Sequence, residues 1–207
     1  MRLPAPHTFR SVLLPIALTT TALATLTACN AGGRVARPTI RGDVAVADDF
    51  DVQLSSLGYA VESEASYDSF QVGVGATFFG EDSEDGRAYG RKLSRAELVV
   101  GSVSVEDFDV IEVSGGGRFY FGGHPMVQPF VGVHAVGSYI EEIAGVDPGT
   151  QVGLRGGAGV ELAVTDSVFF DVAIDYTLPL LAAESDTDPF FGATVESELE
   201  GWALRVG

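Results

Sequence analysis

Hydrophobic and polar residues alternate along most of the chain from residue 50 onward. In the segment 70–79 the apolar positions are Phe70, Val72, Val74, Ala76 and Phe78. The residues between them are mostly small or polar, so the two faces of the segment differ. A period of two predicts a β-strand with unlike surroundings on its two sides, and helical spacing does not explain it.

Two further segments, 151–162 and 168–178, repeat this alternation on either side of the short turn 165–167. Each has one apolar face. The opposite face is rich in glycine in the first segment and carries acidic residues in the second. The pair predicts an antiparallel hairpin. Each strand has about 12 residues, roughly twice the usual length in a soluble sheet.

We expect eight strands in all. Their predicted ranges are 50–62, 68–80, 90–104, 108–122, 127–140, 150–163, 167–178 and 195–206. The third strand is the least regular, because Arg91, Lys92 and Arg95 precede the continuous apolar group 98–100. The acidic stretch 179–194 contains a proline and is interpreted as a loop.

The expected fold class is all-β, an eight-stranded antiparallel up-and-down β-barrel of the transmembrane type. In a lipocalin-like soluble barrel the apolar stripe of each strand faces a ligand cavity, whereas in a membrane barrel it faces lipid and the polar stripe fills the lumen. Glycine mixes with ionisable residues on the polar stripe here, which suits a narrow lumen better than a solvated surface. A soluble barrel that binds an apolar ligand is the alternative.

The ionisable residues of the polar stripe are expected to pair inside the barrel, because unpaired charge away from water is costly. This predicted lumen charge network consists of Arg118, Arg155, Glu161, Asp171, Asp175 and Arg205. Aromatic residues occupy the opposite parity, as in the interfacial girdle of a membrane barrel. They are Phe70, Phe78, Phe119, Phe121, Tyr139, Phe170, Tyr176 and Trp202.

The first 29 residues resemble a bacterial lipoprotein export signal. Arg2 and Arg10 precede an apolar run, and Leu26-Thr27-Ala28-Cys29 matches the lipobox of such signals. The resemblance implies that Cys29 is acylated, with palmitate or a similar fatty acid, and becomes the first residue of the mature chain. Asn30 follows it in place of the aspartate that signals inner-membrane retention, which favours the outer membrane. An ordinary secretory signal or a spanning helix are the alternatives, although the run of about 17 residues is shorter than the roughly 20 that a spanning helix needs.

We therefore divide the chain into a lipoprotein signal peptide (1–28), a lipidated flexible tether (29–48) and a β-barrel domain (49–207). The part after the signal carries ten basic and 29 acidic residues. This balance excludes nucleic acid as a partner, because nucleic-acid binding requires lysine and arginine against phosphates. A single cysteine allows no internal disulfide. We expect a monomer whose partner is outer-membrane lipid.

Three motifs carry a resemblance to a known family. They are Gly-Gly-Gly-Arg-Phe-Tyr-Phe at 115–121, Gln-Pro-Phe-Val-Gly-Val at 128–133 and Gly-Gly-Ala-Gly-Val-Glu at 156–161. Together they resemble the OmpA-type and OmpW-type outer-membrane β-barrel proteins. The resemblance implies a barrel in the cell envelope and implies no activity. The segment 202–207 lacks the final aromatic residue usual in this family, and a lipobox is unusual in it.

Some barrels of this size are enzymes that modify the lipid part of lipopolysaccharide with a serine and a histidine. His134 and Ser138 share one face of a predicted strand, but four residues at about 3.4 Å each place them about 13 Å apart. That separation exceeds the reach of about 3 Å that a nucleophile and its base require. His124 falls in a predicted turn. We assign no catalytic residue, and a lipid-A-modifying enzyme remains the second alternative.

No metal or cofactor site is expected. The acidic turn formed by Glu81, Asp82, Glu84 and Asp85 lacks the ligand spacing of an EF-hand. The glycines at 115–117 lack the helix and lysine of a phosphate loop. The expected function is that of an outer-membrane barrel lipoprotein, non-catalytic, with a structural or small-solute-related role. With eight strands both chain ends lie on the periplasmic side, so the turn 165–167 is periplasmic and the loop 179–194 extracellular.

Overall fold

The computed structural model describes ten stretches of the chain. They are residues 36–56, 59–80, 92–105, 108–122, 124, 126–140, 150–165, 168–181, 183–184 and 195–207. The predicted signal peptide, Cys29 and the acidic turn 81–85 lie outside these stretches. No helix within the described residues is long and apolar enough to cross a membrane.

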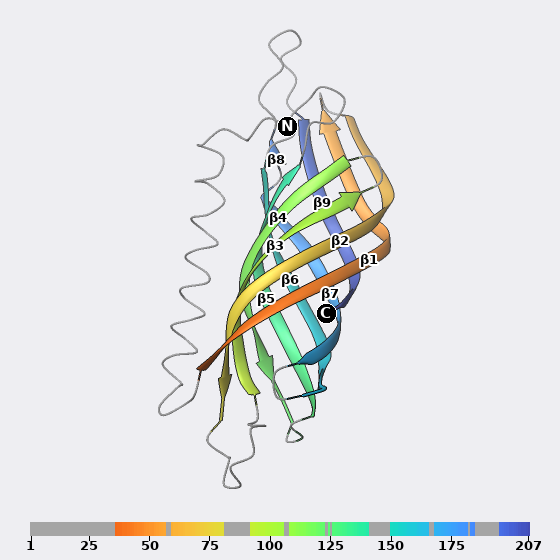
Figure 1. The fold of residues 1–207 in the computed structure, drawn as a ribbon. Helices are drawn as coiled ribbons and strands as arrows, with labels where there is room; N and C mark the ends of the chain where they lie inside the picture. The colour runs from red at the N-terminus through yellow and green to blue at the C-terminus, as the bar shows by residue number, and fades with distance from the viewer. Residues whose placement is uncertain are drawn as a thin grey trace.

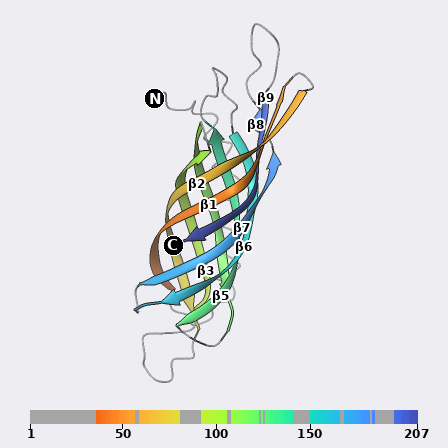
Figure 2. The same ribbon diagram turned by 90° about the vertical axis from the view of Figure 1, so that its right-hand side faces the viewer.

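The described strands form one antiparallel sheet that closes on itself (Figure 1, Figure 2). They are β1 (Ala36–Ser56), β2 (Tyr59–Phe79), β3 (Lys92–Val105), β4 (Phe108–Tyr120), β5 (Val127–Ile140), β6 (Thr150–Ala163), β7 (Phe169–Leu181), β8 (Ala183–Glu184) and β9 (Val195–Val206). Each of the strands β1 to β6 pairs with the strand that follows it in the chain, β7 pairs with β9, and β9 pairs with β1. The short β8 pairs with the beginning of β9, at Glu196 and Ser197.

The prediction of a closed, eight-stranded antiparallel barrel is confirmed, with β8 as a two-residue addition. The expected ranges match β5, β6 and β9 residue for residue, and those of β3, β4 and β7 differ at their ends by at most three residues. Apolar and polar positions alternate over most of these strands, and one face of each is buried inside a narrow barrel. That periodicity is the signal that a sequence carries most clearly.

Two predictions at the start of the barrel are wrong. Residues 36–48 belong to β1 and not to a tether, and the expected strand 50–62 covers the end of β1 and the start of β2. Pro38 and Gly42 suggested a flexible segment, yet Pro38 lies where β1 pairs with β2, before the pairing with β9 begins at Val44. Because β1 is not yet paired with β9 at Pro38, a proline there interrupts no hydrogen bond between these two strands.

The interpretation of 179–194 as a loop is wrong at its beginning. β7 continues to Leu181, and β8 follows at Ala183–Glu184. Residues 185–194 lie outside the described stretches. Leu178 and Leu180 keep the outward, exposed parity of β7, so the strand extends as far as its apolar alternation does.

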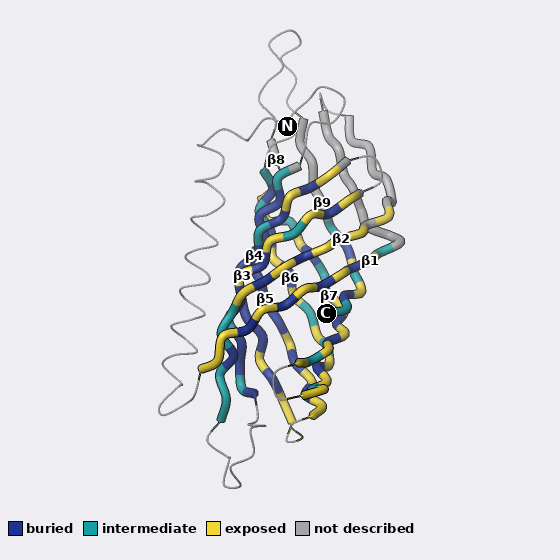
Figure 3. Tube along the Cα trace, viewed as in Figure 1, coloured by how far each residue is buried: buried dark blue, intermediate teal, exposed yellow. Residues whose placement is uncertain are grey.

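The apolar stripe of each strand faces outward and the polar stripe faces inward, which gives the alternating exposure in Figure 3. Outward-facing apolar side chains include Leu154, Val160, Val168, Phe170, Val172 and Ile174, each more than a third exposed. Their inward neighbours on β7, Asp171 and Asp175, are buried. This orientation is opposite to that of a lipocalin-like barrel, so the alternative of an interior apolar ligand cavity is wrong.

The expected aromatic positions follow the same parity. Phe70, Phe119, Phe121, Phe170 and Trp202 are exposed on the outer wall, and Phe78, Tyr139 and Tyr176 are partly exposed. The rings of Trp202 and Tyr176 lie on neighbouring strands in a tilted arrangement, with centroids 4.8 Å apart. Tyr120 and Phe130 are buried on the opposite, lumenal face, 5.7 Å apart.

Candidate functional site

Among the residues whose burial the structure describes, the barrel lumen holds as many positive as negative side chains. The buried cations are Arg41, Lys92, Arg95, Arg118, Arg155 and Arg205, and the buried anions are Asp43, Glu97, Glu112, Glu161, Asp171 and Asp175. The whole chain has a formal net charge of −17, so the excess of negative charge lies outside this lumen set. An interior without net charge avoids the large cost of an unpaired buried ion.

Glu97 of β3 lies at the centre of the network. Its Oε1 atom accepts hydrogen bonds from Arg41 Nη1 at 2.8 Å and Arg118 Nε at 3.0 Å. His134 Nε2 lies 2.8 Å from the same oxygen. One carboxylate on β3 thereby contacts side chains of β1, β4 and β5.

Asp171 of β7 extends this centre to the other side of the barrel. Its Oδ2 atom accepts a hydrogen bond from Arg118 Nη1 at 2.7 Å, and its Oδ1 atom lies 3.9 Å from Arg41 Nη2. Arg41 also pairs with Asp43 on its own strand. Because Arg118 binds Glu97 and Asp171 at once, it connects β3, β4 and β7 through one guanidinium group.

A second cluster forms around Glu161 of β6. This carboxylate pairs with Lys92, lies 2.9 Å from Arg95 Nη2 and accepts a hydrogen bond from the Tyr120 hydroxyl at 2.9 Å. Lys92 Nζ and Arg95 Cζ lie 3.9 Å and 4.7 Å from the centroid of the Phe169 ring. These cation–π contacts add attraction for the two cations where water is excluded.

The third cluster is a bidentate pair between Arg155 and Glu112. The two guanidinium nitrogens lie 2.6 Å and 2.5 Å from the two carboxylate oxygens. Gln71 Nε2 donates to the same carboxylate at 3.0 Å, and Arg155 Nε donates to the Thr177 hydroxyl at 3.0 Å. Fork-to-fork pairing of this kind is strong and fixes both side chains.

The structure places all six residues of the predicted lumen network on the buried face. Two pairs form within the predicted set, Arg118 with Asp171 and Arg205 with Asp175, the latter at 3.0 Å. Arg155 instead pairs with Glu112, and Glu161 pairs with Lys92 and Arg95. The network residues missing from the predicted set are Arg41, Asp43, Lys92, Arg95, Glu97 and Glu112.

Strand parity identifies the missed residues except Lys92, which is buried although its parity is opposite to that of Arg95 and Glu97, next to the register shift between Phe78 and Phe79. Arg95 and Glu97 share the parity of Val99 in β3, and Glu112 shares that of Arg118 in β4. Arg41 and Asp43 fall in the predicted tether, yet they alternate with the exposed residues Gly42 and Val44 as strand residues do.

Inward glycines make room for these large side chains. A Cβ atom on Gly157 would lie 1.8 Å from Asp175 Oδ1, and one on Gly116 would lie 2.1 Å from the Val133 carbonyl oxygen. Any larger residue would collide with the network or with the neighbouring strand. The glycine-rich polar stripe is thus the counterpart of the bulky charged residues opposite it.

The two histidines lie in different surroundings. His134 and Ser138 are both buried on the lumenal face of β5, and His134 contacts the Glu97 carboxylate. His124 is exposed beyond β4, where its Nδ1 accepts a hydrogen bond from the Met126 backbone N–H at 3.3 Å. Within the described residues no group of three or more histidine, cysteine, aspartate or glutamate side chains could hold a metal ion.

The charged clusters fill the lumen and leave their members little contact with solvent. Arg118 is 0% exposed and Glu97 is 2% exposed, although both carry charge. Side chains that line a water-filled pore are accessible from that pore. The buried charges therefore connect the strands to one another through ion pairs and charge-assisted hydrogen bonds.

Comparison with known proteins supports the fold. No protein-family model matches the chain, and no curated protein matches it. Among solved structures, OprG, an outer membrane protein from Pseudomonas aeruginosa, matches with a TM-score of 0.51 and 17% identity, over 82% of this chain and 92% of OprG. Neisserial surface protein A matches with a TM-score of 0.45 and 17% identity, over 83% of this chain and 98% of that protein. At this identity the likeness to OprG shows a shared barrel fold and no shared activity.

Proposed function

We propose that this protein is a non-catalytic, lipid-anchored β-barrel of the bacterial outer membrane, with a structural role in the envelope. The observation that carries the proposal is the polarity of the barrel wall, which is apolar outside and carries paired charges inside, six of each sign among the described residues. An outward apolar stripe on every long strand is what a bilayer requires of a barrel. The likeness of the fold to OprG is consistent with that location.

The filled lumen favours the structural role over a small-solute role. In the part of the barrel that the structure describes, twelve charged side chains are buried in the lumen, and the central ones lie within hydrogen-bond distance of residues on several strands. Opening a path for solutes would require breaking several buried ion pairs, each costly to separate. Resistance to unfolding is the property that such a network provides directly.

The proposed anchor at Cys29 rests on the lipobox resemblance. Several acyl chains hold a protein far more firmly in a membrane than one chain does. Together with the apolar wall, such an anchor attaches the protein to the bilayer at two places. The proposed outer-membrane location follows from the signal and the barrel together.

Conductance in a planar bilayer tests the structural role. Purified protein inserted from one side should produce no current steps above background in 1 M salt over a period on the order of hours. The Debye length is about 3 Å at that ionic strength, but salt screens buried ion pairs much less than exposed ones, so the lumen should stay closed. A double substitution of the two central residues, Glu97→Ala with Arg118→Ala, serves as the positive control for an emptied lumen. Steady ohmic steps from the unaltered protein would contradict a structural role and favour a solute pathway.

A further inference from the structure

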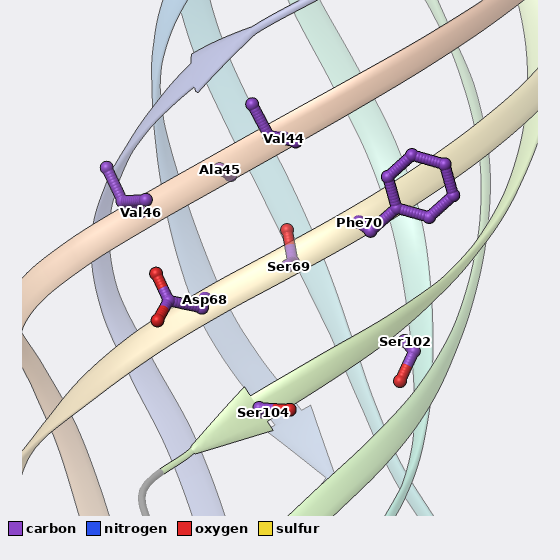
Figure 4. A pocket seen from close by; sticks show the side chains of 8 residues that line it. All are labelled: Val44, Ala45, Val46, Asp68, Ser69, Phe70, Ser102 and Ser104. Atoms are coloured by element: carbon purple, nitrogen blue, oxygen red, sulfur yellow. The ribbon is translucent and has the colours of Figure 1, made fainter.

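The hairpin of β1 and β2 extends beyond the neighbouring hairpin of β3 and β4 at one end of the barrel (Figure 1, Figure 2). β2 pairs with β1 from Tyr59 onward, but its pairing with β3 begins only at Tyr67. Figure 4 shows the outer wall at this point, where Asp68 of β2 lies beside Ser104 near the end of β3. Residues 59–66 of β2 therefore form a strand edge that no described strand covers.

This open edge carries unpaired backbone groups. The reciprocal backbone hydrogen bonds between Gly207 and Asp171, at 2.8 and 2.9 Å, fix which residues of β9 face β7. Alternate residues of an antiparallel strand face opposite neighbours, so the register carries this alternation from β9 through β1 to β2. The residues whose N–H and C=O groups face the open edge are Ala60, Glu62, Glu64 and Ser66. A row of such groups is a template for pairing with a further strand.

The open edge belongs to a small sheet at this end of the barrel. Residues 59–66 of β2 pair with the end of β1, which pairs with 195–201 of β9, which in turn pairs with β8. We call these four segments the projecting sheet. A hairpin alone is marginally stable in water, whereas three or more strands hold one another in place. The edge of β2 is therefore kept extended before a partner arrives, which lowers the entropic cost of binding.

The projecting sheet carries negative charge only. No lysine or arginine occurs in its segments 50–56, 59–66, 183–184 and 195–201. Its acidic residues are Asp51, Glu62, Glu64, Glu184, Glu196, Glu198 and Glu200. Opposite charges on paired strands attract each other and like charges repel. The composition of the sheet therefore favours a basic partner and disfavours an acidic one.

A second copy of the chain is a poor occupant of this edge. Pairing two β2 edges would place Glu62 and Glu64 of one copy beside the same residues of the other. Like charges directly opposite each other on paired strands are destabilising. Charged residues on edge strands are one of the means by which proteins prevent such self-pairing. The same two residues leave the edge open to a strand of opposite charge.

We propose that residues 59–66 of β2 pair with an extended, basic polypeptide segment of an extracellular partner. The segment adds one strand to the projecting sheet through main-chain hydrogen bonds, which supply the affinity. Glu62 and Glu64 are two residues apart, and residues two apart share one face of a strand. Lysine or arginine at every second position of the partner segment therefore lies beside both glutamates and determines which segments bind.

The extracellular side follows from the proposed function and topology. β1 and β7 both run antiparallel to β9, so the turn after β1 lies at the same end of the barrel as the segment 185–194 after β7. The proposed topology places that segment outside the cell. The strand pairing itself depends on the open edge and the charge of the projecting sheet, and not on the topology.

The test measures the binding of fluorescent synthetic peptides to the full chain in nanodiscs by fluorescence anisotropy. The basic probe is Thr-Lys-Val-Lys-Thr-Lys-Val-Lys-Thr. One control peptide has glutamate in place of each lysine, and the other keeps the lysines and has proline in place of both valines, which removes backbone donors and disfavours strand pairing. We expect the basic probe to bind at least about tenfold more tightly than either control, since one or two net hydrogen bonds account for a factor of that size.

Two double variants with the same change of charge identify the place of binding. Glu62→Gln with Glu64→Gln should weaken binding of the basic probe about five- to tenfold, because two cross-strand charge pairs are lost. Glu196→Gln with Glu198→Gln alters β9, which is covered by β1 and β8, and should weaken binding less than about twofold. Cells that display the chain should bind the basic probe as the nanodiscs do.

Four results would overturn the proposal. Equal affinity for the basic and the proline peptides would mean charge attraction without strand pairing. Equal weakening by the two double variants would place the binding elsewhere on the sheet. Binding in nanodiscs but not to intact cells would exclude an extracellular partner. Pairs of barrels that the basic probe does not separate would assign the edge to a second copy.

The proposed function is judged separately in the same experiment. Entry of the chain into nanodiscs is recorded before any peptide is added, so a failure of peptide binding leaves the membrane location standing. If the chain does not enter nanodiscs, the membrane location is contradicted. The same peptides and variants then test the open edge with the chain in mild detergent.

Discussion

Removing the charge of Glu97 should weaken the barrel more than any exposed substitution. Glu97→Gln keeps the shape of the side chain but leaves the guanidinium groups of Arg41 and Arg118 without their shared carboxylate. Breaking a buried ion pair by removing one partner costs about 3 to 5 kcal/mol. At a urea dependence of about 2 kcal/mol per molar, the midpoint of unfolding should fall by roughly 2 M.

The single tryptophan of the chain reports this unfolding. Trp202 is 62% exposed on the outer wall, so its emission should shift to longer wavelength when the barrel leaves lipid for water. Unfolding is followed in urea with the protein in phospholipid vesicles, from both directions to establish equilibrium. Asp109→Asn is the control, because an exposed carboxylate contributes less than about 1 kcal/mol.

A shift of the Glu97→Gln midpoint no larger than that of Asp109→Asn would refute the reasoning. It would mean that water or neighbouring side chains replace the lost charge at no cost. The lumen charges would then be incidental to stability, and the structural role would lose its physical basis.

Three further predictions concern the pairing, the anchor and the topology. In a double-mutant cycle, Arg205→Gln and Asp175→Asn should each destabilise the barrel, and the double variant should lose less stability than the sum of the two single losses. Additive losses would exclude an interaction between the two residues. Cys29→Ala should abolish incorporation of labelled palmitate, and undiminished labelling would exclude this residue as the anchor. Protease added to intact cells should cut within 185–194, near Asp186 or Phe190, and spare the turn 165–167, whereas cleavage confined to that turn would invert the topology.

The sequence predicts the barrel but not the partners inside it. Strict alternation identifies β6 and the inward parity of Arg155, because one buried face enforces a period of two. Which residue Arg155 meets is decided by the stagger of strands around the closed barrel. Glu112 lies on β4, two strands away, and no local pattern relates the two.

The start of β1 is hidden in the sequence for a different reason. Pro38 and Gly42 belong to residue types that usually interrupt strands, and the alternation around Arg41 is too short to indicate a strand against them. A barrel wall tolerates both, since β2 pairs with this segment along its whole length. Because this part of β1 is not predicted, its inward residues Arg41 and Asp43 are missing from the predicted network.

In a barrel that spans a bilayer, the apolar part of the outer wall faces lipid at more than one depth. Two depths can be read with tryptophan, one at Trp202 and one at position 170 in the variant Phe170→Trp with Trp202→Phe. Trp202 is paired with Tyr176, which lies six residues from Phe170 on β7, about 20 Å along the strand.

Quenching of each tryptophan by brominated acyl chains and by aqueous acrylamide is the most direct measurement. If the barrel spans the bilayer, brominated lipid should quench both tryptophans strongly and acrylamide should quench both weakly. Strong acrylamide quenching with little effect of brominated lipid at either depth would contradict a spanning barrel.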